Sequence, residues 1–256
     1  MKTPHFFKIT LGSLALLFCA GISTASAQFE GTLEINRYSV SENGNESLNA
    51  SHNLSLSPTN ILFSKSEDAE ALDMMGAIEA SSIIIRHDAE DFVFMGNRSE
   101  AVVLKKEELL SMISLMNNVR GMGDKEQNAD TGLELTQTSE TKNIDGYDAQ
   151  KWLMQSEDSD EVFHVWLTEE INIEWGLLSE PWLTDLTLFS DLPFADLMSQ
   201  GKTPIQVERF VNDTLTDRFS LENIEEKNLP NNHFDIPEGT EVVNFQQLLM
   251  KRMSGR

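Results

Sequence analysis

Apolar and polar residues alternate in short runs along most of the chain, and turn-forming residues bound each run. In residues 29–40, Leu33 and Ile35 alternate with the polar Glu34 and Asn36. A period of two residues is typical of a β-strand with one buried face. The same pattern predicts strands at residues 47–57, 59–65, 81–88, 91–97, 100–106, 133–144, 147–155, 161–168, 204–212 and 217–227. Because these runs follow one another closely, an antiparallel meander is favoured over a βαβ fold.

Two local features refine the predicted sheet. Asp145-Gly146 lies between two of the predicted strands, and this pair is a strong signal for a tight hairpin, which needs positive φ angles. In residues 161–168 apolar side chains fall on both faces, with Val165 on one and Trp166 on the other. We therefore expect this strand to be covered on both sides.

Three segments break the strand pattern. In residues 105–123, Leu109, Ile113 and Met116 are spaced as on one face of a helix. Residues 171–201 are rich in apolar residues, and prolines divide them, so we predict several short helical pieces there. Residues 242–253 form a short amphipathic piece at the C-terminal end. The simplest reading is a single α+β domain, a sheet with a few short helices.

The first 27 residues have the composition of a secretory signal peptide. Lys2 and Lys8 precede an apolar run, and Ala25-Ser26-Ala27 supplies small residues at the cleavage position. Cleavage is expected before Gln28, and residues 28–256 would form the domain. No later stretch is long and apolar enough to predict a membrane span. We therefore expect an exported protein, either periplasmic or extracellular.

Charge and cysteine content exclude several functions. The chain carries 42 acidic and 19 basic side chains, a net charge of −23. Such a protein is repelled by phosphate backbones, so no nucleic-acid partner is expected. Cys19 is the one cysteine and lies in the predicted signal peptide, which leaves the exported protein without disulfides or thiolate ligands.

No motif for an enzymatic reaction stands out. The histidines are scattered and none has the spacing of a metal-ligand pair, so no metal is expected. A nucleophile elbow, a phosphate-binding glycine loop and a dinucleotide fingerprint are all absent from the sequence, and no cofactor is expected. Carboxylates are numerous, so a hydrolase with an unrecognised pair of acids remains the third alternative for the function.

The segment SETKNIDGYDAQKWLM, followed by VFHVWLT, resembles the hairpin of exported bacterial proteins with a domain of unknown function, which are similar to GLPGLI-type and LolA/LolB-like envelope proteins. The segment PIQVERFVNDTLTDRFSLENIEEKNLPNNHFDIPEGTE resembles the C-terminal signature of that group. Ala149 stands where the family often has Cys. The resemblance implies a strongly curved antiparallel sheet, a half-barrel whose concave face is capped by short helices. Better-known relatives hold acyl chains in that cavity.

This fold suggests a pocket for a hydrophobic or amphiphilic molecule, such as a lipid. If the helices leave space above the sheet, aromatic, Met and aliphatic side chains would line that space, and Arg86 would bind a head group. The candidate lining residues are Leu109, Ile113, Met116, Trp152, Trp166, Trp175, Trp182 and Phe189. The alternative for these residues is an ordinary hydrophobic core. The first hypothesis for function is therefore a non-catalytic carrier, and the alternative is a protein–protein interaction module of the cell envelope.

Overall fold

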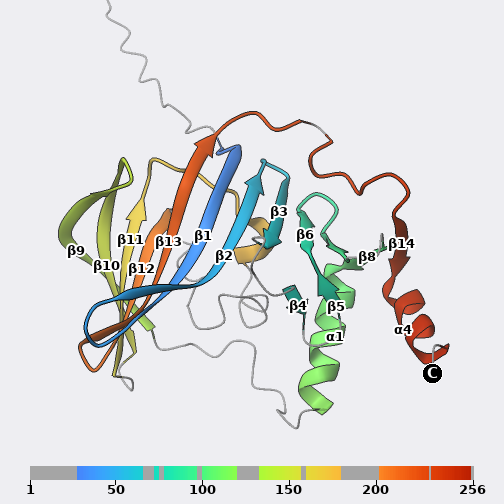
Figure 1. The fold of residues 1–256 in the computed structure, drawn as a ribbon, viewed down its shortest axis with the longest axis horizontal. Coiled ribbons are helices and arrows are strands. Elements are labelled where there is room, and N and C mark those ends of the chain that lie inside the picture. The colour runs from blue at the N-terminus through green and yellow to red at the C-terminus, as the bar shows by residue number, and fades with distance from the viewer. Residues whose placement is uncertain are drawn as a thin grey trace, which may run out of the picture.

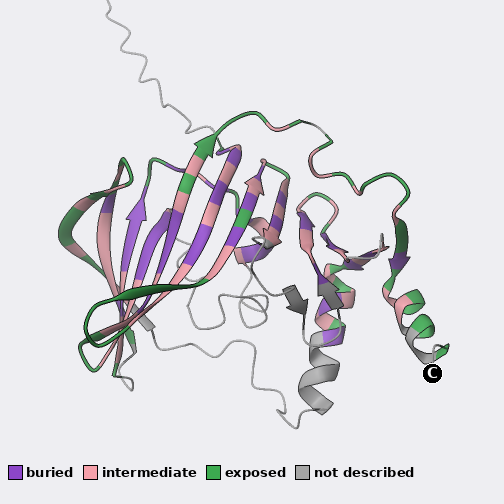
Figure 2. Ribbon diagram, viewed as in Figure 1, coloured by how far each residue is buried: buried purple, intermediate pink, exposed green. Residues whose placement is uncertain are grey.

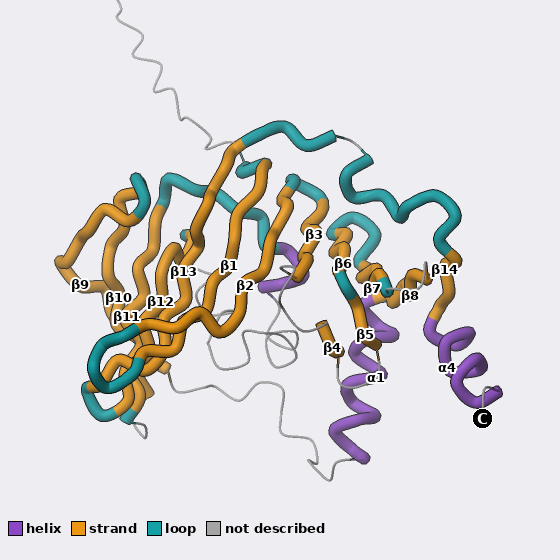
Figure 3. Tube along the Cα trace, in the orientation of Figure 1, coloured by secondary structure: helices purple, strands orange, loops and turns teal. Residues whose placement is uncertain are grey.

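A single sheet of twelve strands dominates the fold (Figure 1). The computed structural model describes residues 28–65, 72–74, 78–96, 100–119, 133–156, 160–179, 202–230 and 232–254. The strand order is β14-β8-β7-β6-β3-β2-β1-β13-β12-β11-β10-β9. The sheet is open and curved, and neighbouring strands are antiparallel except for the parallel pair β14 and β8 (Figure 3).

Two antiparallel meanders supply eleven of the twelve strands of this sheet. The strands of the first meander are β1 (Gly31–Val40), β2 (Glu46–Leu56), β3 (Asn60–Lys65), β6 (Ser82–Arg86), β7 (Asp91–Met95) and β8 (Glu100–Lys105). The strands of the second are β9 (Leu133–Ile144), β10 (Tyr147–Ser156), β11 (Glu161–Thr168), β12 (Thr203–Val211) and β13 (Thr214–Glu226). Pairing of β13 with β1 joins the two meanders in the middle of the sheet.

The remaining elements are a small separate hairpin, the edge strand β14 and the helices. A separate small hairpin is formed by β4 (Leu72–Met74) and β5 (Ile78–Ala80), and β14 (Glu241–Asn244) forms the edge next to β8. The helices in the described part of the chain are α1 (Lys106–Val119), the 3-10 helix η1 (Gly176–Ser179) and α4 (Phe245–Ser254). The fold is therefore α+β but mostly β, with few helices.

Every strand predicted from the period-two pattern is present. The tight hairpin at Asp145-Gly146 is also confirmed, with φ angles of 50° and 98°. Local side chains support this turn, because the Gly146 N–H donates to Asn143 Oδ1 at 3.1 Å. The helix predicted at residues 105–123 is confirmed as α1.

The helical prediction for residues 171–201 is wrong at its start. Residues 171–175 are extended, and the Phe29 N–H donates to the Asn172 carbonyl at 2.7 Å. Ile171, Ile173 and Trp175 are buried while the residues between them are not, which is the alternation of a strand-like segment. Among the described residues of this stretch, 176–179 form a 3-10 helix, and residues 180–201 lie outside the described part.

The C-terminal amphipathic piece also differs from the prediction, because its first residues form β14. Val242 pairs with Ala101 and Val243 with Val102, so this short strand extends the sheet beyond β8. A parallel partner distant in sequence cannot be read from a four-residue segment, which explains the missed strand.

The two faces of the sheet differ in composition. We call the inner face the one that carries Leu33 and Ile35 of β1 and their neighbours Phe219 and Leu221 of β13. These side chains belong to one large buried cluster that also contains residues of η1 and α1 (Figure 2). Burial of this apolar surface is the main stabilising contribution in the fold.

The outer face is polar over the central strands and apolar over β6–β8. There, Ile84, Val93 and Ala101 form a second small cluster, and Phe234 and Ile236 pack against it. Phe234 and Ile236 belong to residues 227–240, which connect β13 to β14 and which we call the crossover segment (Figure 3).

His52 makes the stability of the fold dependent on pH. It is buried on the inner face, its ring stacks on Phe63 with 5.1 Å between centroids, and neither ring nitrogen has a hydrogen-bond partner among the described residues. Burial lowers the pKa of His52 to about 4. In the unfolded chain the pKa is about 6.5, so the unfolded state takes up the proton first as the pH falls below that value.

We therefore predict that acidification from pH 7 to 4.5 removes roughly 2–3 kcal/mol of stability through His52 alone. The variant His52→Phe keeps the aromatic contact and cannot take up a proton. Urea unfolding at both pH values should show a smaller loss of stability in this variant than in the wild-type protein. Equal losses would contradict the assignment.

Gly176 provides a second test, because its position excludes a side chain. Its φ is +46°, and a Cβ atom there would lie 2.3 Å from His87 Nδ1, the atom that accepts a hydrogen bond from the Leu177 N–H. Gly176→Ala should lower the free energy of unfolding by roughly 2–4 kcal/mol, because of backbone strain and the displaced imidazole.

Gly44→Ala is the matched control, since Gly44 also has positive φ but open space around it. It should cost about 1 kcal/mol in the same unfolding measurement. Similar losses for both variants would exclude the steric effect.

Candidate functional site

The predicted pocket residues lie on both faces of the sheet. Trp152 of β10 pairs with Val165 of β11, and both side chains lie on the inner face. Trp166 follows Val165 directly and therefore lies on the outer face. The structure does not bring these two tryptophans into one pocket.

The inner-face candidates pack in the core. Leu109 is 0% exposed and Trp175 is 5% exposed, both within the large buried cluster, while the half-buried Trp152 packs against that cluster. Ile113 and Met116 belong to α1, but their side chains lie outside the described part, as do Trp182 and Phe189 entirely. The described candidates on this face therefore have the environment of core residues.

Arg86 lies on the outer face and forms an ion pair. Its Nε is 2.7 Å from Asp91 Oδ1, and Lys105 Nζ is 3.1 Å from Asp91 Oδ2. Asp91 is almost completely buried, so the two cations compensate a carboxylate removed from water. This contact accounts for Arg86 without a ligand head group.

Trp166 belongs to a polar network on the outer face. Its Nε1 donates to Glu208 Oε2 at 3.3 Å, and Gln206 Nε2 donates to Glu208 Oε1 at 2.6 Å. Lys142 Nζ lies 4.1 Å from the centre of the Trp166 ring and 3.8 Å from Glu208. Burial lowers the pKa of Lys142, and the charge of Glu208 opposes that effect. The carboxylate therefore partly offsets the cost of burying the lysine and accepts the hydrogen bond from the indole.

Glu222 is the centre of a second group on the same face. Asn36 Nδ2 donates to it at 2.8 Å, and the Tyr38 and Ser220 hydroxyls also donate to it. Burial pushes the pKa of Glu222 up, but these hydrogen bonds and the charge of Arg218 outweigh burial and hold the pKa below its ordinary value. A general acid needs the opposite shift, so this carboxylate has the properties of a structural group.

A groove of about 650 Å³ lies between the outer face and the crossover segment. Its floor is formed by Leu62 of β3, Ile84 of β6 and Met95 of β7, with Ser64 and Ser82 beside them. Its other wall consists of Pro230, Asn232, His233, Asp235, Ile236, Pro237 and Glu238 of the crossover segment. The volume is in the range typical of small-molecule sites.

Local contacts fix the crossover segment above the sheet. The Lys227 N–H donates to the Glu30 carbonyl at 3.0 Å, and the Leu229 N–H donates to Glu30 Oε1 at 2.8 Å. At the distal end the segment continues into β14, which pairs with β8, and a hydrogen bond from the Thr240 N–H to the Pro237 carbonyl at 3.2 Å closes a turn just before it. The segment is thus held at both ends, and Ile236 packs toward the apolar floor.

Polarity changes from the floor to the mouth of the groove. Ile84 is buried and Met95 is half-buried, whereas Asp235, Pro237 and Glu238 are exposed. His233 Nε2 is shielded from solvent and has no hydrogen-bond partner among the described residues. An apolar floor with polar groups at the rim suits a molecule with an apolar and a polar part.

Sequence reasoning missed this site, although a signal was present. Ile83, Ile84 and Ile85 form an uninterrupted apolar run, and Phe92, Val93 and Phe94 form another. Such runs indicate strands covered on both faces. The cover on the outer face is the crossover segment, which the strand pattern alone does not place.

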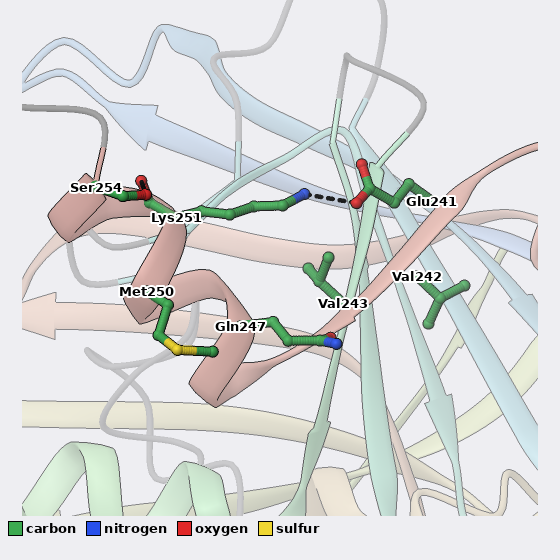
Figure 4. Close-up of a pocket in the computed structure, with 7 residues that line it drawn as sticks. All are labelled: Glu241, Val242, Val243, Gln247, Met250, Lys251 and Ser254. Atoms are coloured by element: carbon green, nitrogen blue, oxygen red, sulfur yellow. Dashed lines mark hydrogen bonds and ion pairs between the residues drawn. The ribbon is translucent and has the colours of Figure 1, made fainter.

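A second, smaller groove of about 260 Å³ lies between β14 and α4 (Figure 4). Val242 and Met250 are among its lining residues and are 51% and 59% exposed, and Lys251 Nζ forms an ion pair with Glu241 at 2.8 Å (Figure 4). Its volume is below that of typical ligand pockets, so the crossover groove is the stronger candidate.

Two further observations on the described residues concern membrane-spanning helices and metal ligands. No helix among them combines the length and hydrophobicity required to cross a membrane. In the same part of the chain, no group of three or more His, Cys, Asp or Glu side chains could hold a metal ion.

No model of a known protein family matches the chain, and no curated protein matches it. Two solved structures of PNGF-II, in different crystal forms, are similar at TM-scores of 0.41 and 0.43, with 16% and 14% identity. They cover 87% and 88% of this chain, which spans only 33% of theirs. The resemblance to GLPGLI-type and LolA/LolB-like proteins stays a prediction.

The role of Glu208 can be measured. Glu208→Gln should destabilise the protein by about 1–3 kcal/mol, because the indole N–H and Lys142 lose a charged partner in a half-buried place. Glu140→Gln is the matched control, since Glu140 pairs with Lys151 at 3.3 Å but is largely exposed. This control should cost less than about 1 kcal/mol in the same denaturation experiment. Equal effects would show that the Glu208 network contributes no more than a surface ion pair.

Proposed function

We propose that this protein is an exported, non-catalytic binding protein that holds a small amphiphilic molecule in the crossover groove. The observation that carries the proposal is the groove itself, about 650 Å³ with an apolar floor and a polar rim. The described candidates for an inner-face pocket pack as core residues, so the proposed ligand site moves from the inner face to the outer one.

The cellular setting of this proposal rests on the sequence. The N-terminal signal pattern supports export, and the absence of cysteine after residue 27 suits a bacterial envelope protein without disulfides. We also propose that the curvature of the sheet is that of a LolA/LolB-like half-barrel, with η1 and α1 on its concave side. The buried cluster shared by these helices and the inner face supports this arrangement.

A protein–protein interaction module is the second candidate. The specific observation in its favour is that Val242 of β14 and Met250 of α4, which both line the smaller groove at the edge of the sheet, are exposed (Figure 4). Exposed apolar side chains that share one surface are typical of docking sites. In this alternative, the crossover groove would have no role in partner binding.

The amphiphile proposal predicts that filling the groove abolishes binding. Ser82 lies on the groove floor and pairs with Ser64 across the strands, so Ser82→Phe adds an apolar side chain without removing any core contact. We expect at least a tenfold loss of affinity for a C12 amphiphile, measured by isothermal titration calorimetry below the critical micelle concentration.

Thr136→Phe is the matched control, because Thr136 is an exposed small hydroxyl residue on β9, at the other edge of the sheet. It should bind like the wild type. Equal affinity in the two variants would exclude the groove as the site. A wild-type protein that binds no C12 ligand, whether cationic, neutral or anionic, and carries none in native mass spectrometry would contradict the proposed function.

A further inference from the structure

The crossover groove has a distinct charge pattern. Among the described residues that line it, Asp235 and Glu238 are the acidic groups and none is Lys or Arg. Neither carboxylate has an ion-pair partner in the described part of the chain. Other carboxylates on the outer face are compensated, such as Asp91 by Arg86 and Lys105. The mouth of the groove therefore carries uncompensated negative charge.

We propose that the groove selects amphiphiles with a positively charged amine head group. This inference rests on the function proposed above and specifies the chemical class of its ligand. The alkyl part would lie on Leu62, Ile84 and Met95, and the head group would lie between Asp235 and Glu238 at the rim. Charge complementarity at the rim decides between ligands with the same apolar part.

A hydrogen-bonding group supports an ammonium head with N–H donors. His233 lines the groove, and its Nε2 atom is shielded from solvent without a partner among the described residues. Ser64 and Ser82 add hydroxyl oxygens beside the apolar floor. A primary ammonium can donate three hydrogen bonds, and the two rim carboxylates together with the His233 nitrogen supply acceptors for them.

The charge of the whole protein acts in the same direction but cannot give selectivity for one site. With a net charge of −23, the protein attracts cations and repels anionic ligands at long range. At physiological ionic strength, salt largely screens this attraction at distances beyond about 8 Å. A test of the proposal must therefore separate the two rim carboxylates from the general charge.

The experiment compares three C12 ligands by isothermal titration calorimetry at 0.15 M salt, each below its critical micelle concentration. They are dodecylammonium, dodecyl maltoside and dodecyl sulfate. We expect dodecylammonium to bind at least tenfold more tightly than the other two. The double variant Asp235→Asn/Glu238→Gln should lose about tenfold in affinity for dodecylammonium and change little for the maltoside, since two partly exposed ion pairs are removed.

Asp145→Asn/Asp213→Asn is the matched control, because it removes the same charge from two exposed hairpin turns that do not line the groove. Its affinity should stay within twofold of the wild type. An equal loss in both double variants, or equal binding of the three ligands, would overturn the charge selectivity while leaving the binding function intact. Failure of all three ligands to bind would overturn both proposals.

Discussion

The pairing of β13 with β1 is the contact on which the rest of the structure depends. It joins the two meanders, and side-chain contacts such as Asn36 with Glu222 reinforce it across 186 positions of sequence. Without this pair each meander would expose a free strand edge. The pair also places the end of β13 in the middle of the sheet, whereas its successor β14 lies at the edge.

That placement explains the crossover segment. Six strands separate β13 from β14 in the sheet, a width of roughly 34 Å at about 4.8 Å per strand. The fourteen residues of the crossover segment span at most roughly 50 Å, so they can cross the sheet with little slack. Where they pass over β6–β8, Phe234 and Ile236 cover the outer apolar cluster. The groove lies where the crossover segment leaves part of this outer face uncovered.

Local order was predictable from the sequence, and long-range order was not. The strands and the Asp145-Gly146 turn depend on residues close in the chain, and both are confirmed. The β14 pairing and the contact of Ile236 with the floor connect residues far apart, and no single-sequence pattern encodes such contacts. Residues 171–175 did alternate with period two, but their position before a proline-divided apolar region favoured a helix in the prediction.

The division of the aromatic candidates has a simple geometric cause. Side chains alternate between faces along a strand, so the face of Trp152 relative to Trp166 depends on the register of β10 against β11. In the observed register Lys151, not Trp152, is opposite Trp166. Trp166 then lies beside Lys142 and Glu208, in a network that stabilises the outer face. An aromatic residue in a two-sided sheet therefore indicates a pocket only once its face is known. Here the face under the crossover segment combines an apolar floor with an open, acidic rim.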